Sequence, residues 1–441
     1  MRAETPLLPN IGEPNHLDHY FPLPGNLLMR LFFSLTCLVV CGSTSLAQEW
    51  TRFHGPNGEG QSDTLFPGQF ATSDFAWRKE LPGAGHSSPV LWGDKLFVLG
   101  SDRTTAERIV ICLDAETGST RWTKEYESQT HPLHARSSYA SSSPAVDAER
   151  VYVAWSTRDT TTLMALDHDG SEVWKLDLGR WIGSHGFGTS PMLYQDMVIL
   201  HNSLQAKSLE PGERPGDSTM LAFNRTTGDA VWRSPRGGAR VCYSVPAIYQ
   251  PPIGPDELIC CSTSEGIFSL NPLNGQLNWK TEGAIKMRSI SSPLIADGLI
   301  FGSTGSGGGG NYVVAVRPSR EPEIVYQVKR NAPYVPTLVA HEGMLFLFYD
   351  KGIVSCLDMQ TGAEHWRERI AAGFSGSPIR AGDKVYCISD DGELICVAAS
   401  KEFKSFGKTE LGESSRSTPA VHQGRMYLRT DTHIICVEKE D

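Results

Sequence analysis

One short step recurs eight times along this chain and limits its possible folds more than any other feature. The step is a small residue followed by Pro and an apolar residue, and a short apolar strand pattern comes after it. The copies lie about 40 to 55 residues apart and begin at Ser88, Ser143, Ser190, Val245, Ser292, Val335, Ser377 and Thr418. Such a period predicts an array of similar units, each of which buries its apolar face against the next.

A second pattern closes each unit with a tight turn and a Trp. In the clearest copy, Cys112-Leu113-Asp114 leads to Thr117-Gly118 and then to Trp122. An Asp at the start of a turn bonds the amides two residues on, and Gly supplies the positive φ that tight turns need. Each unit is therefore predicted to hold three strands, a turn and a fourth strand whose aromatic ring packs between units. The tryptophans at this position are Trp122, Trp174, Trp232, Trp279 and Trp366, with Tyr326 near it in the fifth unit and Phe403 or Phe406 in the seventh.

The last unit lacks a fourth strand of its own, because the chain ends soon after Cys436 and Val437. The missing Trp is supplied by Trp77, far upstream in the sequence. Pairing the first strand with the last unit closes a ring and leaves no open sheet edge. We therefore predict an all-β protein. Residues 74–441 form an eight-bladed β-propeller of four-stranded antiparallel blades, closed by the N-terminal strand around Trp77.

The segment before the repeats is typical of an export signal. The apolar run at 31–40 is too short to span a bilayer and is followed by small residues up to Ala47. We predict a signal peptide over residues 29–47, cleaved after Ala47, and a mature protein in the periplasm or outside the cell. Residues 48–73 are then an N-terminal arm packed on the ring.

Two further features bear on the N-terminus. Residues 1–28 are Pro-rich and carry acidic groups, which is unusual before a signal peptide, so we expect them to be a non-native or unstructured extension upstream of a start at Met29. A lipoprotein signal would use Cys41, but Val40 before it is bulky for that motif. No other segment is apolar enough to cross a membrane.

The charge balance restricts the partners. The formal net charge is −10 and the isoelectric point is about 5.7. Nucleic acids and anionic membranes favour a basic face, so we expect neither as a partner. We expect a monomer that binds a protein in the cell envelope.

The Asp-x-x-Thr-Gly-x-x-x-Trp pattern after a small-Pro step resembles the PQQ-type propeller repeat, from about Phe75 to the C-terminus. That family includes quinoprotein alcohol dehydrogenases and non-enzymatic outer-membrane assembly proteins of the BamB type. The leader from Trp50 to Gly60 is also similar to the segment before such propellers in secreted members. In the enzymes, the resemblance implies a Glu, Asn and Asp set that holds Ca²⁺ beside the quinone, an Asp base, and often a disulfide between adjacent cysteines.

The candidate site is one rim of the channel, where the loops that enter the inner strands lie. These loops carry aromatic, His and Arg side chains rather than the acids that Ca²⁺ needs. They form a candidate binding ring with a cationic part to which Lys286 also contributes. The candidates are His86, Tyr139, His185, Arg240, Tyr243, Arg288, Tyr334, Phe374 and Arg416. Two histidines from separate blades are too few for a metal site, and we predict none.

The cysteines are predicted to be packing residues. Four of them share one column of small residues just before the Leu-Asp position, where the steric fit excludes larger side chains. Cys260 and Cys261 are adjacent, but in a strand their side chains point to opposite faces, which opposes a bond between them. A strained disulfide or a cofactor contact at this pair remains an alternative.

The sequence therefore favours an exported binding or assembly scaffold without catalysis and without a bound cofactor. One alternative is an oxidoreductase that depends on PQQ and Ca²⁺. Another is a sensor that binds a sugar or a peptide at the rim aromatics. The same ring can host all three functions.

Overall fold

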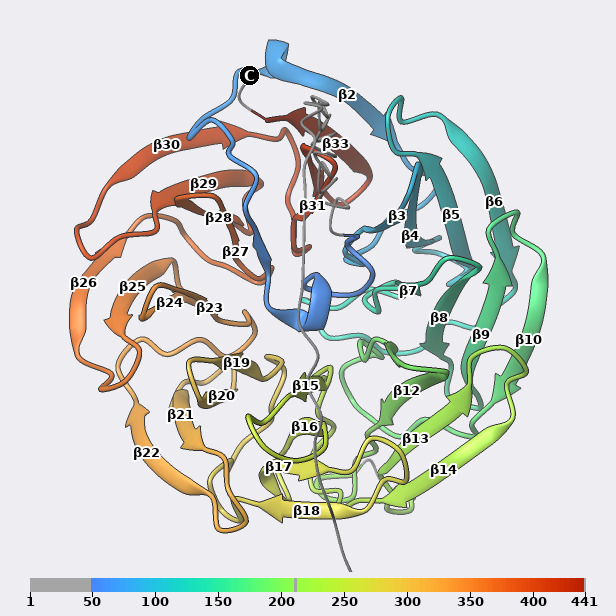
Figure 1. Cartoon of the computed structure of the whole chain (residues 1–441). Coiled ribbons are helices and arrows are strands. Elements are labelled where there is room, and N and C mark those ends of the chain that lie inside the picture. Colours follow the sequence, from blue (N-terminus) through green and yellow to red (C-terminus); the bar gives the residue numbers. More distant parts are fainter. Residues whose placement is uncertain (1–48, 210–211, 440–441) are drawn as a thin grey trace, which may run out of the picture. The chain divides into compact units, whose positions relative to one another are not determined.

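The strands form eight blades around a central channel (Figure 1). The structure is a computed structural model that describes residues 49–209 and 212–439. Each blade holds four antiparallel strands from the channel to the rim, which confirms the predicted all-β, eight-bladed propeller. The strands follow the sequence order except in the eighth blade, whose outer strand comes from the N-terminal side, and the seventh blade gains a fifth, parallel strand. The predicted extension over 1–28, the signal peptide over 29–47 and the cleavage after Ala47 lie outside the described residues.

The four strands of a blade occupy four concentric positions (Figure 1). The inner strands are β3 (Val90–Trp92), β7 (Ala145–Val146), β11 (Met192–Tyr194), β15 (Ala247–Tyr249), β19 (Leu294–Ala296), β23 (Val339–His341), β27 (Ile379–Ala381) and β31 (Ala420–His422). The second strands are β4 (Lys95–Ser101), β8 (Arg150–Ser156), β12 (Met197–Asn202), β16 (Glu257–Ser262), β20 (Leu299–Thr304), β24 (Met344–Tyr349), β28 (Lys384–Ile388) and β32 (Arg425–Arg429).

The second and third strands are almost wholly buried, because both of their faces meet neighbouring blades. The third strands are β5 (Arg108–Asp114), β9 (Thr161–Asp167), β13 (Thr219–Asn224), β17 (Gly266–Leu270), β21 (Tyr312–Arg317), β25 (Ile353–Asp358), β29 (Glu393–Ala398) and β33 (His433–Glu438). The outer strands are β6 (Thr120–Tyr126), β10 (Glu172–Asp177), β14 (Ala230–Pro235), β18 (Leu277–Lys280), β22 (Glu323–Val328), β26 (Glu364–Arg369), β30 (Ser405–Glu410) and β2 (Phe75–Glu80).

The ring closes as predicted from Trp77. Strand β2 pairs antiparallel with β33, with Trp77 opposite Cys436. The Trp77 ring lies 5.9 Å from that of Tyr427 in the same blade. It also faces Gly118 of the next blade, where an added Cβ would come within 2.6 Å of the indole. Gly118 has a φ of +70°, so glycine both allows the turn and leaves room for the neighbouring ring.

The outer-strand aromatics join each blade to the next. The indole N–H of Trp122 donates to the carbonyl of His168 at 2.8 Å, and the Tyr326 hydroxyl donates to that of Met359 at 2.6 Å. Trp279 is an exception, because its N–H bonds Glu257 within its own blade. The small column stands opposite these rings across the strand pair, at Cys112, Ala165, Ala222, Ser269, Ala315, Cys356, Cys396 and Cys436.

The seventh blade departs from the predicted aromatic position. Gly407, rather than Phe403 or Phe406, stands opposite Cys396. The N-terminal arm covers this blade, and a Cβ on Gly407 would come within 2.7 Å of Gln69. Phe403 instead packs 5.1 Å from Trp366 of the preceding blade. The arm therefore takes the space that an aromatic ring fills in the other blades.

The recurring Ser or Thr of the small-Pro step links the blades by hydrogen bonds around the channel. In seven of the eight blade pairs, the backbone N–H of this residue donates to the hydroxyl of its counterpart in the next blade, at 2.8–3.1 Å. In the sixth blade the residue is Thr337, so the predicted step at Val335 and Pro336 is displaced by two residues. The remaining pair lacks a hydroxyl, because Val245 stands where Ser190 would find its acceptor. We call these residues the hydroxyl ring; its members are Ser88, Ser143, Ser190, Ser292, Thr337, Ser377 and Thr418.

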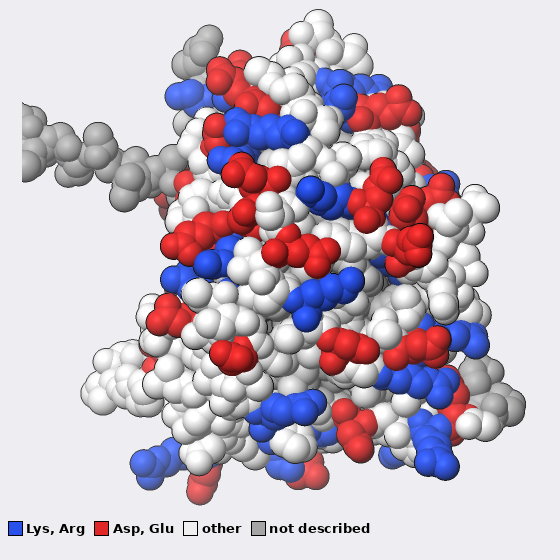
Figure 2. Space-filling model, turned by 90° about the vertical axis from the view of Figure 1, so that its right-hand side faces the viewer, with Lys and Arg blue, Asp and Glu red and all other residues white. Residues whose placement is uncertain are grey.

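The outer surface carries both signs of charge. Figure 2 shows basic and acidic side chains interspersed over one side of the ring. Arg121, for example, pairs with both Asp94 and Asp114. All eight cysteines of the described residues are buried and free, including Cys260 and Cys261. Within the described residues, no helix is long and apolar enough to cross a membrane.

Candidate functional site

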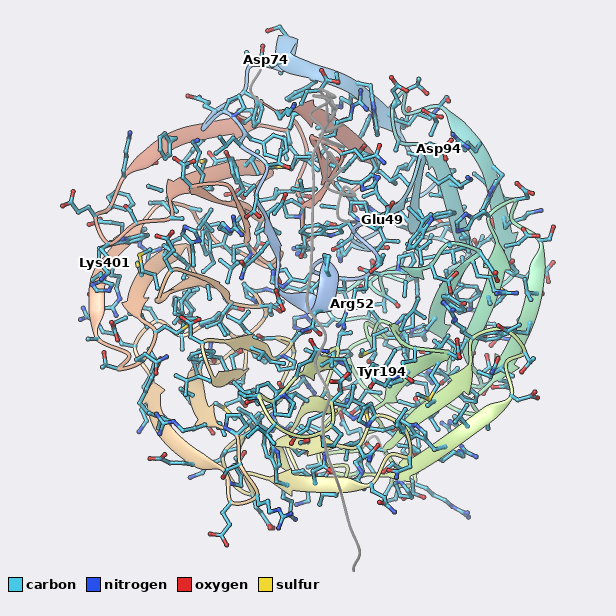
Figure 3. All side chains as sticks on the ribbon, viewed as in Figure 1. Glu49, Arg52, Asp74, Asp94, Tyr194 and Lys401 are labelled. Atoms are coloured by element: carbon cyan, nitrogen blue, oxygen red, sulfur yellow. The ribbon has the colours of Figure 1, made fainter. Side chains whose placement is uncertain are left out.

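The N-terminal arm closes one end of the channel. The blue segment that begins at residue 49 runs to the centre of the ring in Figure 1, and Figure 3 shows Arg52 there. Arg52 donates to the carbonyl of Pro246 at 2.7 Å. The two ring nitrogens of His54 lie 2.7 Å from the carbonyl oxygens of Gly58 and Pro378. The arm then forms the 3-10 helix η1 (Pro56–Gly58), strand β1 (Gln61–Ser62) parallel to β27, and the 3-10 helix η2 (Thr72–Asp74).

The inner strands are sheet edges, and the arm satisfies some of their free amides. Four inner-strand N–H groups donate to arm oxygens: Leu91 to Trp50, Val146 to Thr51, Ile248 to Asn57 and Arg380 to Gly60. Each donor stands three positions after the hydroxyl-ring position of its blade. The arm therefore lies further along the channel than the hydroxyl ring. It covers the edges of inner strands that would otherwise be open.

The other end of the channel is a cavity, here called the cup, with a volume of about 630 Å³. Phe53 of the arm belongs to its lining, together with five members of the hydroxyl ring. The cationic and imidazole side chains of the lining are Arg136, Arg240, Arg288, Arg416, His86, His134 and His185. No Asp or Glu is among the described residues that line the cup. The volume falls in the range of about 300–1,000 Å³ that small-molecule sites occupy.

Seven of the nine predicted rim residues lie together in the lining of the cup. They are His86, His185, Arg240, Tyr243, Arg288, Tyr334 and Arg416. Tyr139 lies instead in an adjoining side pocket of about 360 Å³, which shares His86 and Arg416 with the cup. Phe374 is buried in the core, with its ring 5.1 Å from that of Phe348, and it lines neither the cup nor the side pocket. Lys286 is exposed and is not part of the lining.

Sequence reasoning missed lining residues from three segments. Phe53 comes from the arm, and Ser306 and Gly307 come from the Gly-rich insertion of the fifth blade. His134 and Arg136 come from the connection between the first two blades. The last two could have been found from the unusual length of that connection, residues 127–144, but nothing in the sequence places Phe53 or Ser306 at the channel.

The connection 127–144, here called the strap, reaches across the open end. Arg136 on the strap lies 3.5 Å from Asp350, which follows β24 of the sixth blade. Figure 1 places the strands β6 and β24 on opposite sides of the ring. Asp350 is buried and also accepts the backbone N–H groups of Tyr334 and Val335. A single ion pair therefore spans the mouth of the cup.

Burial and the cationic lining lower the pKa values of two histidines of the cup, His86 and His185. Burial, together with the nearby charges of Arg416, Arg429 and Arg103, lowers the pKa of His86 to about 3. Burial is the main cause that lowers the pKa of His185, and the electrostatic effects of Arg288, His134 and Arg240 lower it further. The imidazole of His185 stacks on that of His134 at 5.0 Å. Both shifts follow from desolvation and positive potential, and both favour neutral imidazoles.

The lining does not fit the calcium-bound quinone that some propellers of this type carry. Ca²⁺ takes six to eight oxygen ligands, with carboxylates prominent among them. In the described residues, no group of three His, Cys, Asp or Glu side chains has the arrangement of a metal site. Asp350 is already held by two amides and Arg136. Guanidinium groups would repel a divalent cation at this place.

Comparison with known proteins identifies the family. The family model described as outer membrane protein assembly factor BamB matches residues 61–142, 106–368 and 350–441. The chain belongs to the BamB-type PQQ-like propeller family. No curated protein sequence matches it.

Solved structures share the fold of this BamB-type propeller at low sequence identity. BamB from Moraxella catarrhalis is 13% identical, with a TM-score of 0.57 over 82% of this chain and 98% of that one. A europium-containing methanol dehydrogenase is 13% identical, with a TM-score of 0.61 over 86% and 89%. The quinohemoprotein alcohol dehydrogenase from Comamonas testosteroni is 13% identical, with a TM-score of 0.66 over 89% and 80%. These likenesses extend to the fold alone, so the function has to be argued from the cup.

Proposed function

We propose that this chain is an exported propeller that binds a partner in the cell envelope and performs no catalysis of its own. The observation that carries this proposal is the lining of the cup, which offers cations, hydroxyls and aromatic rings but no carboxylate. Such a lining can hold a ligand, yet it supplies neither the acids that bind Ca²⁺ nor a carboxylate general base. A protein partner accords with the family, whose model is described as an assembly factor.

The alternative of a quinone-dependent oxidoreductase rests on the fold of its structural neighbours and lacks support from the cup. The sensor alternative has more support, because Tyr243 and Tyr334 both belong to the lining. Aromatic faces beside hydroxyl donors are suited to sugars as well as to peptides. A sensor would also perform no catalysis, and it would bind its ligand at the same end of the channel.

The first test separates binding from quinone chemistry. The mature chain, from Gln48 onward, is titrated with PQQ and Ca²⁺ while thermal unfolding is followed. We expect no shift of the melting temperature that depends on Ca²⁺. A bound cofactor at a hundredfold excess over its dissociation constant would add about 2.7 kcal/mol to the unfolding free energy. A calcium-dependent rise of that size would contradict the proposal.

The second test addresses the partner. The tagged mature chain is used to capture proteins from an envelope extract, beside Arg416→Gln in the cup and Arg233→Gln on the exposed face of β14. We expect the intact chain and Arg233→Gln to retain the same protein and Arg416→Gln to retain less of it. Equal capture by all three would show that the open end is not the binding surface. Capture of no envelope protein would refute the scaffold function.

A further inference from the structure

We propose that the cup binds a small organic anion that carries two or more carboxylate, sulfate or phosphate groups. This inference rests on the proposed function, because it assigns the ligand chemistry of the same open end. The chain as a whole is acidic, at −10, whereas the described lining of the cup contains four arginines and no acid. A local charge opposite to that of the whole protein is a property of the site and not of the composition.

The arginines come from separate connections and converge on one cavity. Arg136 lies between the first and second blades, Arg240 and Arg288 on either side of the fourth, and Arg416 between the seventh and eighth. Of these, Arg136 meets a carboxylate, Asp350. Guanidinium groups placed around a cavity suit a ligand with several anionic groups, because each planar fork binds one oxyanion.

Several donors of the lining have no partner within the described protein. The Nδ1 of His86, the hydroxyl of Tyr243 and the Nε of Arg416 are all buried and make no hydrogen bond. A buried polar group without a partner is destabilising, so protein interiors rarely leave several together. An acceptor-rich ligand in the cup would satisfy these groups.

The hydroxyl ring adds further donors. Each of its lining members, such as Ser143 and Ser190, already accepts a backbone N–H from the preceding blade. A hydroxyl that accepts in this way keeps its own hydrogen to donate. The part of the cup nearest the arm therefore presents five hydroxyl donors, and such donors favour oxyanions as ligands.

The ligand also has an organic body. The cavity of about 630 Å³ is far larger than an inorganic anion needs, and its lining includes Phe53, Tyr243 and Tyr334. The arm blocks passage through the ring, so a ligand enters and leaves by the strap end. These features favour a compact molecule that the cup encloses over a threaded polymer or peptide.

The strap couples entry of the ligand to an ion pair. An anion beside Arg136 competes with Asp350 for the guanidinium, so Asp350 weakens the binding of anions. Removal of that charge by Asp350→Asn keeps one oxygen, which can accept the 2.6 Å bond from the Tyr334 N–H, and gives up only the longer 3.3 Å bond from the Val335 N–H. The substitution should therefore strengthen anion binding while the local fold is preserved.

The experiment is calorimetric titration of the full mature chain at 0.15 M salt with citrate, a disulfated disaccharide, the unsulfated disaccharide and a Glu-rich peptide. We expect binding of citrate or the sulfated sugar and none of the neutral sugar. Arg240→Gln and Arg416→Gln should each weaken that binding five- to tenfold, Asp350→Asn should strengthen it two- to fivefold, and the control Arg233→Gln should leave it unchanged. Circular dichroism of each variant confirms that it is folded.

Each other outcome is informative. No binding of either anionic probe, or equal binding of the neutral sugar, would overturn the inference. Binding of the peptide alone would also overturn it, in favour of an acidic protein segment. PQQ without Ca²⁺ is a further arm, and binding of PQQ without binding of citrate or the sulfated sugar would overturn the inference in favour of a dedicated quinone site. If the intact chain captures an envelope protein but binds no anion, this inference alone is refuted. If it binds the anion but captures no envelope protein, the scaffold function alone is refuted.

Discussion

At the residue scale, the Ser or Thr of the repeated step has a function beyond its small size. Its hydroxyl accepts the backbone N–H of the preceding blade, and seven such bonds run around the channel. Each intramolecular hydrogen bond adds about 0.5–1.5 kcal/mol to stability, so the circuit of seven bonds between neighbouring blades stabilises the closed ring. Val245 is the one position where the circuit is open.

The substitution Val245→Thr should close the circuit. Thr preserves the shape of Val and adds the hydroxyl that can accept the Ser190 amide, so we expect the free energy of unfolding to rise by about 1 kcal/mol. Conversely, Ser143→Ala removes the acceptor of the Ser88 amide at a cost of about 1–3 kcal/mol, whereas Ser143→Thr should be nearly neutral. Urea denaturation of the four proteins checks this. A destabilised Val245→Thr would mean that apolar contacts around Val245 outweigh the new bond.

At the element scale, the arm acts as the floor of the cup and as a cover for the inner strands. His54 is fully buried and bridges the arm to the seventh blade through Pro378. Gly60 permits this, because it has a φ of +64° and a Cβ there would come within 2.3 Å of the His54 ring. The spacing of His54 and Gly60 in the leader thus reflects a local packing requirement.

The substitution His54→Gln should loosen the arm. The amide of Gln cannot reproduce both contacts of the imidazole, so we expect a loss of about 2–3 kcal/mol from broken hydrogen bonds and poorer packing. Hydrogen exchange of residues 50–60 should accelerate while the blades stay protected. The exposed His365→Gln serves as the matched control and should change neither property. Unchanged exchange in the His54 variant would show that other contacts anchor the arm.

At the scale of the whole molecule, one N-terminal segment has two separate functions. It closes the ring of blades, and it blocks one end of the channel. Residues 49–73 cross the channel, and β2 then completes the eighth blade against β33. Without β2, the strand β33 would be an exposed edge, and unpaired edges template aggregation.

Two truncations distinguish these functions. A chain that begins at Asp74 keeps β2 and loses the arm, so we expect a folded ring with a lower melting temperature and no anion binding. A chain that begins at Leu81 loses the closing strand as well, so we expect aggregation or failure to fold. Size-exclusion chromatography and thermal unfolding compare them with the chain from Gln48. A monomeric, cooperatively folded chain from Leu81 would show that closure by β2 is dispensable.

The sequence alone determined the number of blades, their strand order and the closure by Trp77. These properties follow from local chemistry that repeats: a turn needs Gly, an outer strand presents a Trp, and a period of such units has few solutions. Sequence reasoning also selected seven residues that line the cup, because a loop before an inner strand always reaches the same rim.

Only the tertiary structure decided that the channel is a cup. The contacts that close it join residues far apart in the chain, such as Arg52 with Pro246 and His54 with Pro378, and each is made once. The same holds for Gly407 under the arm, for Phe374 in the core and for Arg136 across the mouth. A repeat predicts what every blade shares, since periodicity reports the average unit. It carries no information about a segment that crosses the ring once, and that segment creates the site.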